Sequence, residues 1–251
     1  MFKARIRTEV LRELVEVVST LVSEVKLSVS KDGVEVKAVD PSHVAMLVLK
    51  LEGNVFEEFT GEPTQIGVDM EKLKDVLRLS KPGEVIDLQY DGGKSRLVVK
   101  VGRVTRHMAI IDPAGMAEPK VPNVNPPTLA VVRMDEIRQG IRGSESVSDH
   151  VTIQVDPEHF AMYSEGETDR VDLALALPVG KEGSGLSRLE AKESVKSMYP
   201  LYFFSAMMKS ITSAEEVTLH VGNEYPLKIE FAVAGGKGSG RFLLAPRVEE
   251  D

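Results

Sequence analysis

The sequence predicts an α+β fold built from two copies of one domain. Three observations indicate this: an apolar pattern that repeats along the chain, the same order of expected strands and helices in both halves, and a proline-rich segment between them. With 251 residues, the chain has the length of one large or two ordinary domains. It can bury a substantial core without disulfides.

The repeat is a shared apolar pattern with low identity. The stretch from Arg5 to Leu51 can be laid on Val131 to Leu177 without a gap. Matched apolar positions include Leu11 with Ile137, Val25 with Val151, Leu27 with Ile153, Leu47 with Leu173, Leu73 with Phe204, and Ile86 with Val217. Near the end of each copy, Asp112-Pro113 falls at Ala245-Pro246. Two copies of one domain are the most economical interpretation of this pattern.

Each copy is expected to run strand, helix, several strands, helix, several strands. Phe2, Ala4 and Ile6 alternate with basic residues, which is the period of a half-buried strand. Apolar residues at helical spacing predict a helix from Thr8 to Ser23, with Thr8 as its N-cap. Further elements are expected as strands at 25–29 and 34–38 around the turn Lys31-Asp32-Gly33, a helix from about Met70 to Ser80, and strands flanking Asp91-Gly92-Gly93.

The join between the copies is rich in proline. Asp112 to Thr128 contains five of the chain's thirteen prolines, so it should run extended over the surface as a semi-rigid connector. A passive linker is an equally good interpretation, although the apolar Met116, Val121 and Val124 favour a binding partner. The expected division is residues 1–114, a connector at 115–128, and residues 129–251.

Composition excludes several functions. The chain has no cysteine, which excludes disulfides, zinc sites with thiolate ligands and cysteine nucleophiles. No apolar run approaches the roughly 20 residues needed to cross a bilayer, and the alternating N-terminus does not resemble a signal peptide. We therefore expect a soluble intracellular protein. The net charge of −8 argues against a nucleic-acid partner unless basic residues are locally concentrated.

Basic residues do gather on the expected helices. Near Met70, the apolar positions 73, 76 and 77 form a core stripe, while Lys74, Arg78 and Lys81 share another face. In the second copy, Arg138 and Arg142 lie one turn apart, outside the stripe of Met134, Ile137 and Ile141, and Lys209 ends the fourth helix. A solvated helix face is the ordinary explanation of such charges. Their recurrence in both copies of an acidic protein favours a functional role.

No pattern predicts catalysis or metal binding. The five histidines are scattered and form no motif such as H-E-x-x-H. Ser148-Asp149-His150 contains triad residue types, but neighbours in sequence do not thereby have triad geometry. The glycine-rich segment 235–240 lacks the order of a phosphate-binding loop and is better interpreted as a hairpin tip. We expect no enzyme, no cofactor and no metal.

Several motifs together resemble one family, the proliferating cell nuclear antigen family of sliding clamps in its archaeal form. The resemblance covers the whole chain in order. The motifs are Met1–Ile6 at the start, Lys37–Met46 after the first hairpin, Ile66–Met70 at the second helix, Ile110–Pro113 before the connector, Tyr225–Leu227, and Leu243–Glu249 at the end.

The resemblance implies a ring-shaped homotrimer of two-domain subunits, with antiparallel sheets outside and helices lining a central hole for DNA. By position, Arg12, Arg78 and Arg142 match basic residues of the family's inner surface. Lys74, Lys81, Arg138 and Lys209 lie near them and complete the expected DNA-facing set. The chain departs from the family at Glu13, Asp75 and Gln139, where relatives often carry a basic residue. Weak, sequence-independent phosphate contacts would favour sliding.

The resemblance also implies a site for client peptides and a subunit interface. In the family, short peptides insert apolar anchors beneath the connector and pair along it. The matching positions are His43, Val44, Met46, Val121, Pro122, Pro226, Leu243, Leu244, Ala245 and Pro246. Edge strands at about Arg103–Ile111 and Val171–Leu177 should close the ring, which gives as interface residues Arg103, Arg106, Met108, Ile110, Val171, Leu173 and Leu175.

The implied function is that of a processivity clamp for replicative DNA polymerase, which encircles double-stranded DNA. It would also serve flap endonuclease, DNA ligase and repair proteins, and a clamp loader ATPase would open it. Its location would be the cytoplasm or nucleoid of an archaeon, or the nucleus of a eukaryote. The alternatives are a subunit of a heterotrimeric clamp, a two-repeat transcription factor that bends DNA, and an unrecognised enzyme.

Overall fold

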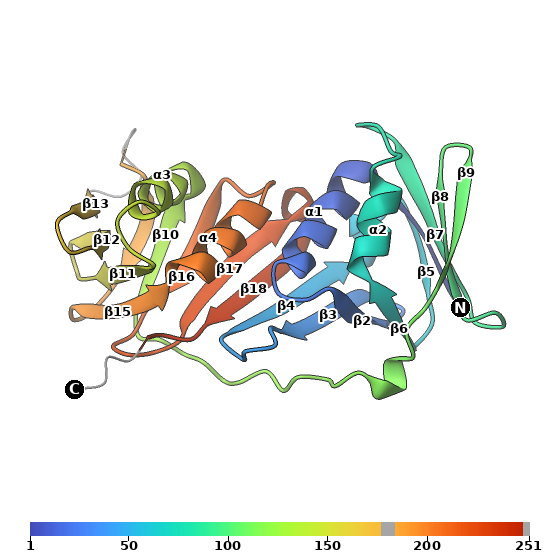
Figure 1. Ribbon diagram of the computed structural model, residues 1–251, viewed down its shortest axis with the longest axis horizontal. Helices are drawn as coiled ribbons and strands as arrows, with labels where there is room; N and C mark the ends of the chain where they lie inside the picture. The colour runs from blue at the N-terminus through green and yellow to red at the C-terminus, as the bar shows by residue number, and fades with distance from the viewer. Residues whose placement is uncertain (177–183, 248–251) are drawn as a thin grey trace. The chain divides into compact units, whose positions relative to one another are not determined.

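The computed structural model describes residues 1–176 and 184–247, which form two compact units (Figure 1). Unit 1 contains Met1–Val121 and Ala232–Gly240, and unit 2 contains Pro122–Phe231 and the chain from Arg241 onward. The division at Val121 falls inside the expected connector. Residues 232–240 come from the second copy of the repeat but belong to unit 1, which the repeat did not predict. Leu177 of the expected edge strand and Val248-Glu249 of the C-terminal motif lie outside the described residues.

Unit 1 contains two antiparallel sheets and two helices. One sheet has the order β5-β1-β7-β8-β9, and a second run of strands has the order β4-β3-β2-β6. The elements are β1 (Phe2–Arg7), α1 (Thr8–Ser19), β2 (Glu24–Val29), β3 (Gly33–Val39), β4 (Ala45–Glu52), η1 (Gly53–Val55), β5 (Glu58–Gly61), β6 (Thr64–Asp69), α2 (Met70–Leu77), β7 (Val85–Asp91), β8 (Arg96–Val101), β9 (Val104–Ala109) and η2 (Pro113–Gly115).

Unit 2 repeats this plan. Its strands run β14-β10-β16-β17 in one sheet and β13-β12-β11-β15 in the other, all antiparallel. The elements are β10 (Leu129–Arg133), α3 (Met134–Ser144), β11 (His150–Val155), β12 (His159–Glu165), β13 (Arg170–Ala176), β14 (Leu186–Glu190), β15 (Val195–Pro200), α4 (Leu201–Ser210), β16 (Glu216–His220) and β17 (Leu227–Val233). The second copy continues with η3 (Ala234–Gly236), which belongs to unit 1, and β18 (Gly238–Leu244), whose first three residues belong to unit 1. The element order of β1–β9 with α1 and α2 recurs as β10–β18 with α3 and α4, so the predicted duplication is confirmed.

The core of each unit lies where the two helices pack on the sheets. The predicted stripes are buried: Leu73, Val76 and Leu77 on α2, and Met134, Ile137 and Ile141 on α3. In each unit the two helices contact each other and lie side by side (Figure 1). Burial of one apolar face per helix leaves the opposite face to solvent.

The same tertiary hydrogen bonds fix the helix N-termini in both units. The first N–H of α1, on Thr8, donates to Glu84 O at 2.9 Å, and that of α3, on Met134, donates to Glu215 O at 2.8 Å. The first N–H of α2 donates to Ser23 O and that of α4 to Asp149 O, both at 2.8 Å. Each bond satisfies a helix-end donor that would otherwise lack a partner.

These bonds correct two expectations about the first helix. Thr8 is the first helical residue rather than the N-cap, because its N–H is taken by Glu84 O, and Arg7 precedes it in extended conformation. The Thr8 hydroxyl is buried without a hydrogen-bond partner among the described residues. The helix also ends at Ser19, four residues before the expected Ser23, because the carbonyl of Ser23 caps α2 and the chain then enters β2.

In a second correspondence, the chain that follows the last strand of each copy forms an isolated bridge with the strand that ends one of its sheets, β6 in unit 1 and β15 in unit 2. Ile111 forms an isolated bridge with Gly67 on β6, and Arg247 forms one with Met198 on β15. A Cβ atom on Gly67 would lie 2.3 Å from the carbonyl oxygen of Ile111, so only glycine permits this approach. Arg247 therefore takes the place of Ile111, and the expected match of Asp112-Pro113 with Ala245-Pro246 is shifted.

An arginine of the first helix caps the second helix in each unit. The Arg12 guanidinium on α1 donates to Leu77 O at 3.2 Å and to Ser80 Oγ at 3.4 Å, just at the end of α2. The Arg138 guanidinium on α3 donates to Ile211 O at 2.6 Å, at the end of α4. A cation at a helix C-terminus satisfies a free carbonyl and interacts favourably with the helix dipole.

We predict that Arg138→Met lowers the free energy of unfolding by about 1–2 kcal/mol, because the carbonyl at the end of α4 loses a charged donor. Arg12→Met should have a similar effect through α2. Urea denaturation followed by circular dichroism measures both. Arg142→Met is the matched control, since Arg142 is exposed one turn further along α3. Equal stability of the Arg138→Met and Arg142→Met proteins would show that the cap is unimportant.

Candidate nucleic-acid and partner-binding surfaces

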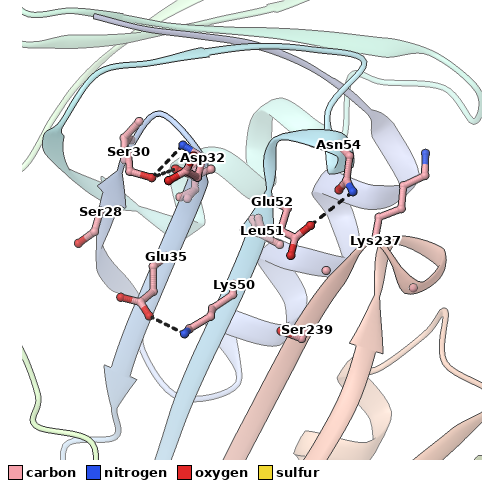
Figure 2. A pocket seen from close by; sticks show the side chains of 15 residues that line it. Ser28, Ser30, Asp32, Glu35, Lys50, Leu51, Glu52, Asn54, Lys237 and Ser239 are labelled. Atoms are coloured by element: carbon pink, nitrogen blue, oxygen red, sulfur yellow. Dashed lines mark hydrogen bonds and ion pairs between the residues drawn. The ribbon is translucent and has the colours of Figure 1, made fainter.

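A pocket on unit 1 is lined by several charged and polar side chains. Its volume is about 540 Å³, and strands β2, β3 and β4 and residues 236–239 line it. Figure 2 shows two contacts between its side chains: Lys50 Nζ lies 3.7 Å from Glu35 Oε1, and Asn54 Nδ2 donates to Glu52 at 3.4 Å. Lys50 and Glu35 are thus partners within the pocket. Within residues 1–176 and 184–247, no group of three or more His, Cys, Asp or Glu residues is placed to hold a metal.

The triad-like residues 148–150 do not form a triad. The Ser148 hydroxyl accepts the backbone N–H of His150 at 3.3 Å rather than contacting its ring. The imidazole contacts the Asp149 carboxylate, and Arg247 Nη1 lies 2.8 Å from its Nε2. Among the described residues, the hydroxyl is therefore not hydrogen-bonded to a general base. No helix in the described part of the chain is both long and apolar enough to cross a membrane.

Three of the seven expected DNA-facing residues form ion pairs with acidic neighbours. On α2, Lys74 Nζ lies 3.2 Å from Glu71 and Arg78 Nη1 lies 2.9 Å from Asp75. On α4, Lys209 Nζ lies 2.6 Å from Glu145 Oε1, and the Ser205 hydroxyl donates to the same oxygen at 2.8 Å. The hydrogen bonds from Lys209 and Ser205 lower the pKa of Glu145, so it stays ionised at neutral pH.

The other four divide into two kinds. Arg12 and Arg138 are engaged in capping α2 and α4, as described above. Arg142 and Lys81 are exposed, and no ion pair involves either of them in the part of the chain that the structure describes. They are therefore the basic side chains most available to a phosphate.

Glu13 and Asp75, two of the positions where relatives often carry a basic residue, lie in different surroundings. Glu13 is 3% exposed, and its Oε2 accepts the backbone N–H of Ala234 at 3.1 Å, so it does not belong to the solvent face of α1. Asp75 is exposed and is the partner of Arg78. The Glu13 carboxylate therefore holds a backbone N–H in the interior of unit 1. The Asp75 carboxylate instead neutralises a basic side chain on the solvent face of α2.

The sequence pattern missed an exposed aromatic residue on α4. Tyr202 is 79% exposed, and the other exposed residue of α4 is Lys209. The two are seven residues apart and so share one face, two turns apart. The helical spacing of Tyr202 and Lys209 could have predicted this exposed face, because residues seven apart lie on the same side of a helix.

The expected interface residues lie on two edge strands. β9 is the last strand of its sheet in unit 1, and β13 is the last strand of its sheet in unit 2. Along β9, Arg106 is half-buried and Met108 is buried; Arg103 and Ile110 flank the strand. On β13, Val171 and Leu173 are half-buried and Leu175 is buried. Such edges carry unpaired backbone donors and acceptors that favour pairing with another chain.

The expected client-binding residues are described unit by unit. In unit 1, His43 and Val121 are exposed, Val44 is half-buried and Met46 is buried. In unit 2, Pro122 is exposed, Pro226, Ala245 and Pro246 are half-buried, and Leu243 and Leu244 are buried. Met46, Leu243 and Leu244 are core side chains, and the other seven expected residues are exposed or half-buried.

A buried carboxylate holds the loop that presents His43. Asp40 is 4% exposed; its carboxylate accepts the N–H of Ala45 at 2.6 Å, the N–H of Ser42 at 2.8 Å, and the Ser42 hydroxyl. His43 itself has a φ of 58°, a conformation that costs energy for a residue other than glycine. Burial alone would raise the pKa of Asp40, but the hydrogen bonds outweigh it and the pKa is lowered.

Lysines hold the start of the connector against unit 1. Lys26 Nζ on β2 donates to Met116 O at 2.9 Å, and Lys37 Nζ on β3 lies 3.4 Å from Glu118 and 3.0 Å from Glu35. Residues 116–127 have neither helix nor strand, as their proline content predicts (Figure 1). The connector is therefore extended and is fixed by side chains rather than by its own backbone pairing.

Comparison with known proteins gives matches over the whole chain. The models described as "Proliferating cell nuclear antigen, N-terminal domain" and "Proliferating cell nuclear antigen, C-terminal domain" match residues 1–108 and 127–247. A Methanothrix thermoacetophila protein named DNA polymerase sliding clamp is 36% identical over 252 residues, with 100% of each chain covered.

Two solved structures are also similar. PCNA of A. fulgidus with the C-terminal region of FEN-1 bound has a TM-score of 0.92 at 27% identity, with 100% of both chains covered. PCNA of Thermococcus kodakaraensis has a TM-score of 0.89 at 25% identity, with 98% of this chain and 100% of that chain covered. The similarity therefore extends to the arrangement of the elements.

We predict that Asp40→Asn destabilises the protein by about 1–3 kcal/mol at neutral pH, because buried N–H groups lose a charged acceptor. Since the pKa of Asp40 is lowered by folding, its contribution is present above the unfolded pKa of roughly 4 and is lost as pH falls through the folded value. Urea denaturation at pH 7 and at lower pH measures the difference, which should shrink on acidification. A difference independent of pH would contradict the ionised network.

Proposed function

Since this chain belongs to the proliferating cell nuclear antigen family, we propose that it is a DNA polymerase sliding clamp. The observation that carries this proposal is the match of residues 1–108 and 127–247 to the two domains of that family, together with a relative of that name that matches the whole chain. The family is non-enzymatic. The full-length match favours the clamp over a DNA-bending transcription factor or an unrecognised enzyme.

The proposed mechanism is topological tethering. A closed ring around duplex DNA stays on the DNA without tight binding, and a protein held by the ring has a raised local concentration at the template. Weak phosphate contacts, which fall with rising salt, permit sliding. The basic but ion-paired helix faces suit this requirement better than a strongly positive surface would.

Ring closure would use β9 of one subunit and β13 of the next. Both are edge strands, so each can gain backbone hydrogen bonds from a partner. Joining two different edges head to tail generates a closed ring when the rotation between subunits closes. We propose a homotrimer, with Arg103, Arg106, Met108 and Ile110 on one side and Val171, Leu173 and Leu175 on the other.

The DNA-facing surface would be formed by the solvent faces of the helices. Arg142 and Lys81 are the most available phosphate contacts, and Lys74, Arg78 and Lys209 can exchange an acidic partner for a phosphate. Arg12 and Arg138 contribute positive charge while they cap α2 and α4. Sequence-independent contacts of this kind position DNA without reading its bases.

The partners would include replicative DNA polymerase, flap endonuclease, DNA ligase and repair proteins, with a clamp loader ATPase to open the ring. The solved complex of A. fulgidus PCNA with the C-terminal region of FEN-1 supports a flap nuclease among them. We propose that client peptides contact the exposed or half-buried His43, Val44, Val121, Pro122, Pro226, Ala245 and Pro246. These clients act on the chromosome, so the chain would work in the cytoplasm or nucleoid of an archaeon, or in the nucleus of a eukaryote.

Val104→Glu is expected to break the ring. Val104 is an exposed apolar residue on β9, and a carboxylate there would be desolvated by a neighbouring strand. Light scattering after size exclusion should change from three times the subunit mass of 27.5 kDa to a single subunit. Leu79→Glu is the control, because Leu79 is exposed but lies on no edge strand. A trimeric Val104→Glu protein would refute the assignment of β9, and a monomeric parent would favour the heterotrimer.

Reversal of Arg78 and Arg142 to Glu should reduce processive synthesis on a circular primed template at least tenfold while the mass stays trimeric. The reason is that two phosphate contacts become repulsive. Primer extension with loader and polymerase measures the effect. Normal processivity in the double variant would remove these helices from the DNA-facing surface.

Val121→Asp should weaken binding of a client peptide at least tenfold, because an exposed apolar contact is replaced by a charge. Fluorescence anisotropy with a labelled peptide from the C-terminal region of a flap endonuclease provides the measurement. Leu79→Asp, at an exposed apolar position outside the connector and the edge strands, serves as the control. An unchanged affinity would place the peptide site elsewhere.

A further inference from the structure

We propose that the acidic residues Glu71, Asp75 and Glu145 limit the grip of the clamp on DNA by occupying its basic residues. Each of the three holds one expected phosphate contact: Lys74, Arg78 and Lys209 respectively. This inference rests on the proposed function, because it concerns the same helix surface. It assigns to the acids a role in setting the strength of DNA binding, which the basic residues alone do not determine.

The geometry of the pairs supports this assignment. In α2 both pairs join an acid to a base three residues later, Glu71 to Lys74 and Asp75 to Arg78, so the acids lie on the same helix surface as the bases. In unit 2 the acid comes from the end of α3 and the base from α4. The two units therefore reach the same pairing of a helix base with an acid by different routes.

The exposure of two of the three pairs makes partner exchange possible; in the third, Lys74 is 25% and Glu71 65% exposed. The side chains of Arg78 and Asp75 are 75% and 51% exposed, and those of Lys209 and Glu145 are 61% and 41% exposed. An ion pair in such contact with water is weak: the measured strength of exposed pairs corresponds to a factor of about 1.4 to 5 in an equilibrium. A phosphate can therefore displace the carboxylate, but each contact is weakened by that factor.

Repulsion adds to this effect. A carboxylate that loses its partner to a phosphate remains beside the DNA backbone as a like charge. Glu145 is held by Ser205 as well as by Lys209, so it stays in place when the lysine moves. The acids therefore favour a contact that forms and breaks readily, as sliding requires.

The test uses the full-length protein with Glu71→Gln, Asp75→Asn and Glu145→Gln, singly and together. Binding to a short fluorescent duplex is followed by anisotropy between about 50 and 200 mM salt. The triple variant should bind several-fold more tightly at low salt, with the slope of log K against log salt steeper by up to about 0.9 for each released base. Unchanged affinity and slope in the triple variant would overturn the proposal.

The matched control is Glu58→Gln. Glu58 is an exposed acid paired with Arg5 at 3.0 Å on the β1–β5 strand pair, so its removal changes net charge equally but away from the helices. Arg5 keeps Asp87 as a partner at 2.9 Å. If Glu58→Gln raises DNA affinity as much per charge as the helix variants do, the effect belongs to overall charge and the proposal is wrong.

The salt slope separates this role from helix stabilisation. Acids that only stabilised α2 or the contact of α3 with α4 would, on removal, lower the melting temperature and leave the slope unchanged. Arg142→Glu separates the proposal from its premise. If that variant binds DNA as the parent does, the DNA-facing surface itself is misassigned. If it binds less tightly while the triple variant is unchanged, only the role of the acids is refuted.

Discussion

Burial of one apolar face of each helix against the sheets is the constraint on which the rest of each unit depends. Because the apolar face of each helix is buried, the charged side chains lie on the opposite face, in solvent. On α4 this is nearly complete, since Tyr202 and Lys209 are its exposed residues. The core therefore determines which side chains a helix presents to solvent as well as the fold, because a residue cannot be on both faces of one helix.

The two units share the hydrogen bonds that fix their helix ends, although most of their side chains differ. The first N–H of each helix meets a carbonyl from an equivalent loop, and an arginine of the first helix caps the second in both units. These groups are the ones that a helix cannot satisfy by itself. A duplicated domain can change most of its sequence while these few bonds keep the helices in place, which explains low identity beside a shared element order.

The surfaces follow a common principle of weak, replaceable contacts. Acids accompany bases on the helices, lysines hold the connector through one carbonyl and one carboxylate, and the two edge strands offer backbone groups for pairing. The exception is the Asp40 loop, where a buried carboxylate with several donors fixes a strained residue beside the proposed client site. Rigidity is concentrated where a peptide needs a preformed contact, and exchangeable pairs lie where DNA would slide.

The sequence by itself determined the duplication, the element types, the core stripes and the extended connector, because apolar periodicity and proline content act locally. It also placed basic residues outside the stripes. Tertiary structure alone decided their partners: Thr8 became helical because Glu84 takes its N–H, Glu13 turned inward to Ala234, and Arg12 and Arg138 became helix caps. These outcomes depend on groups about 60 to 220 residues away in the chain, which no local pattern encodes. Periodicity fixes the face a side chain occupies, but only the packed fold brings the atom that it meets.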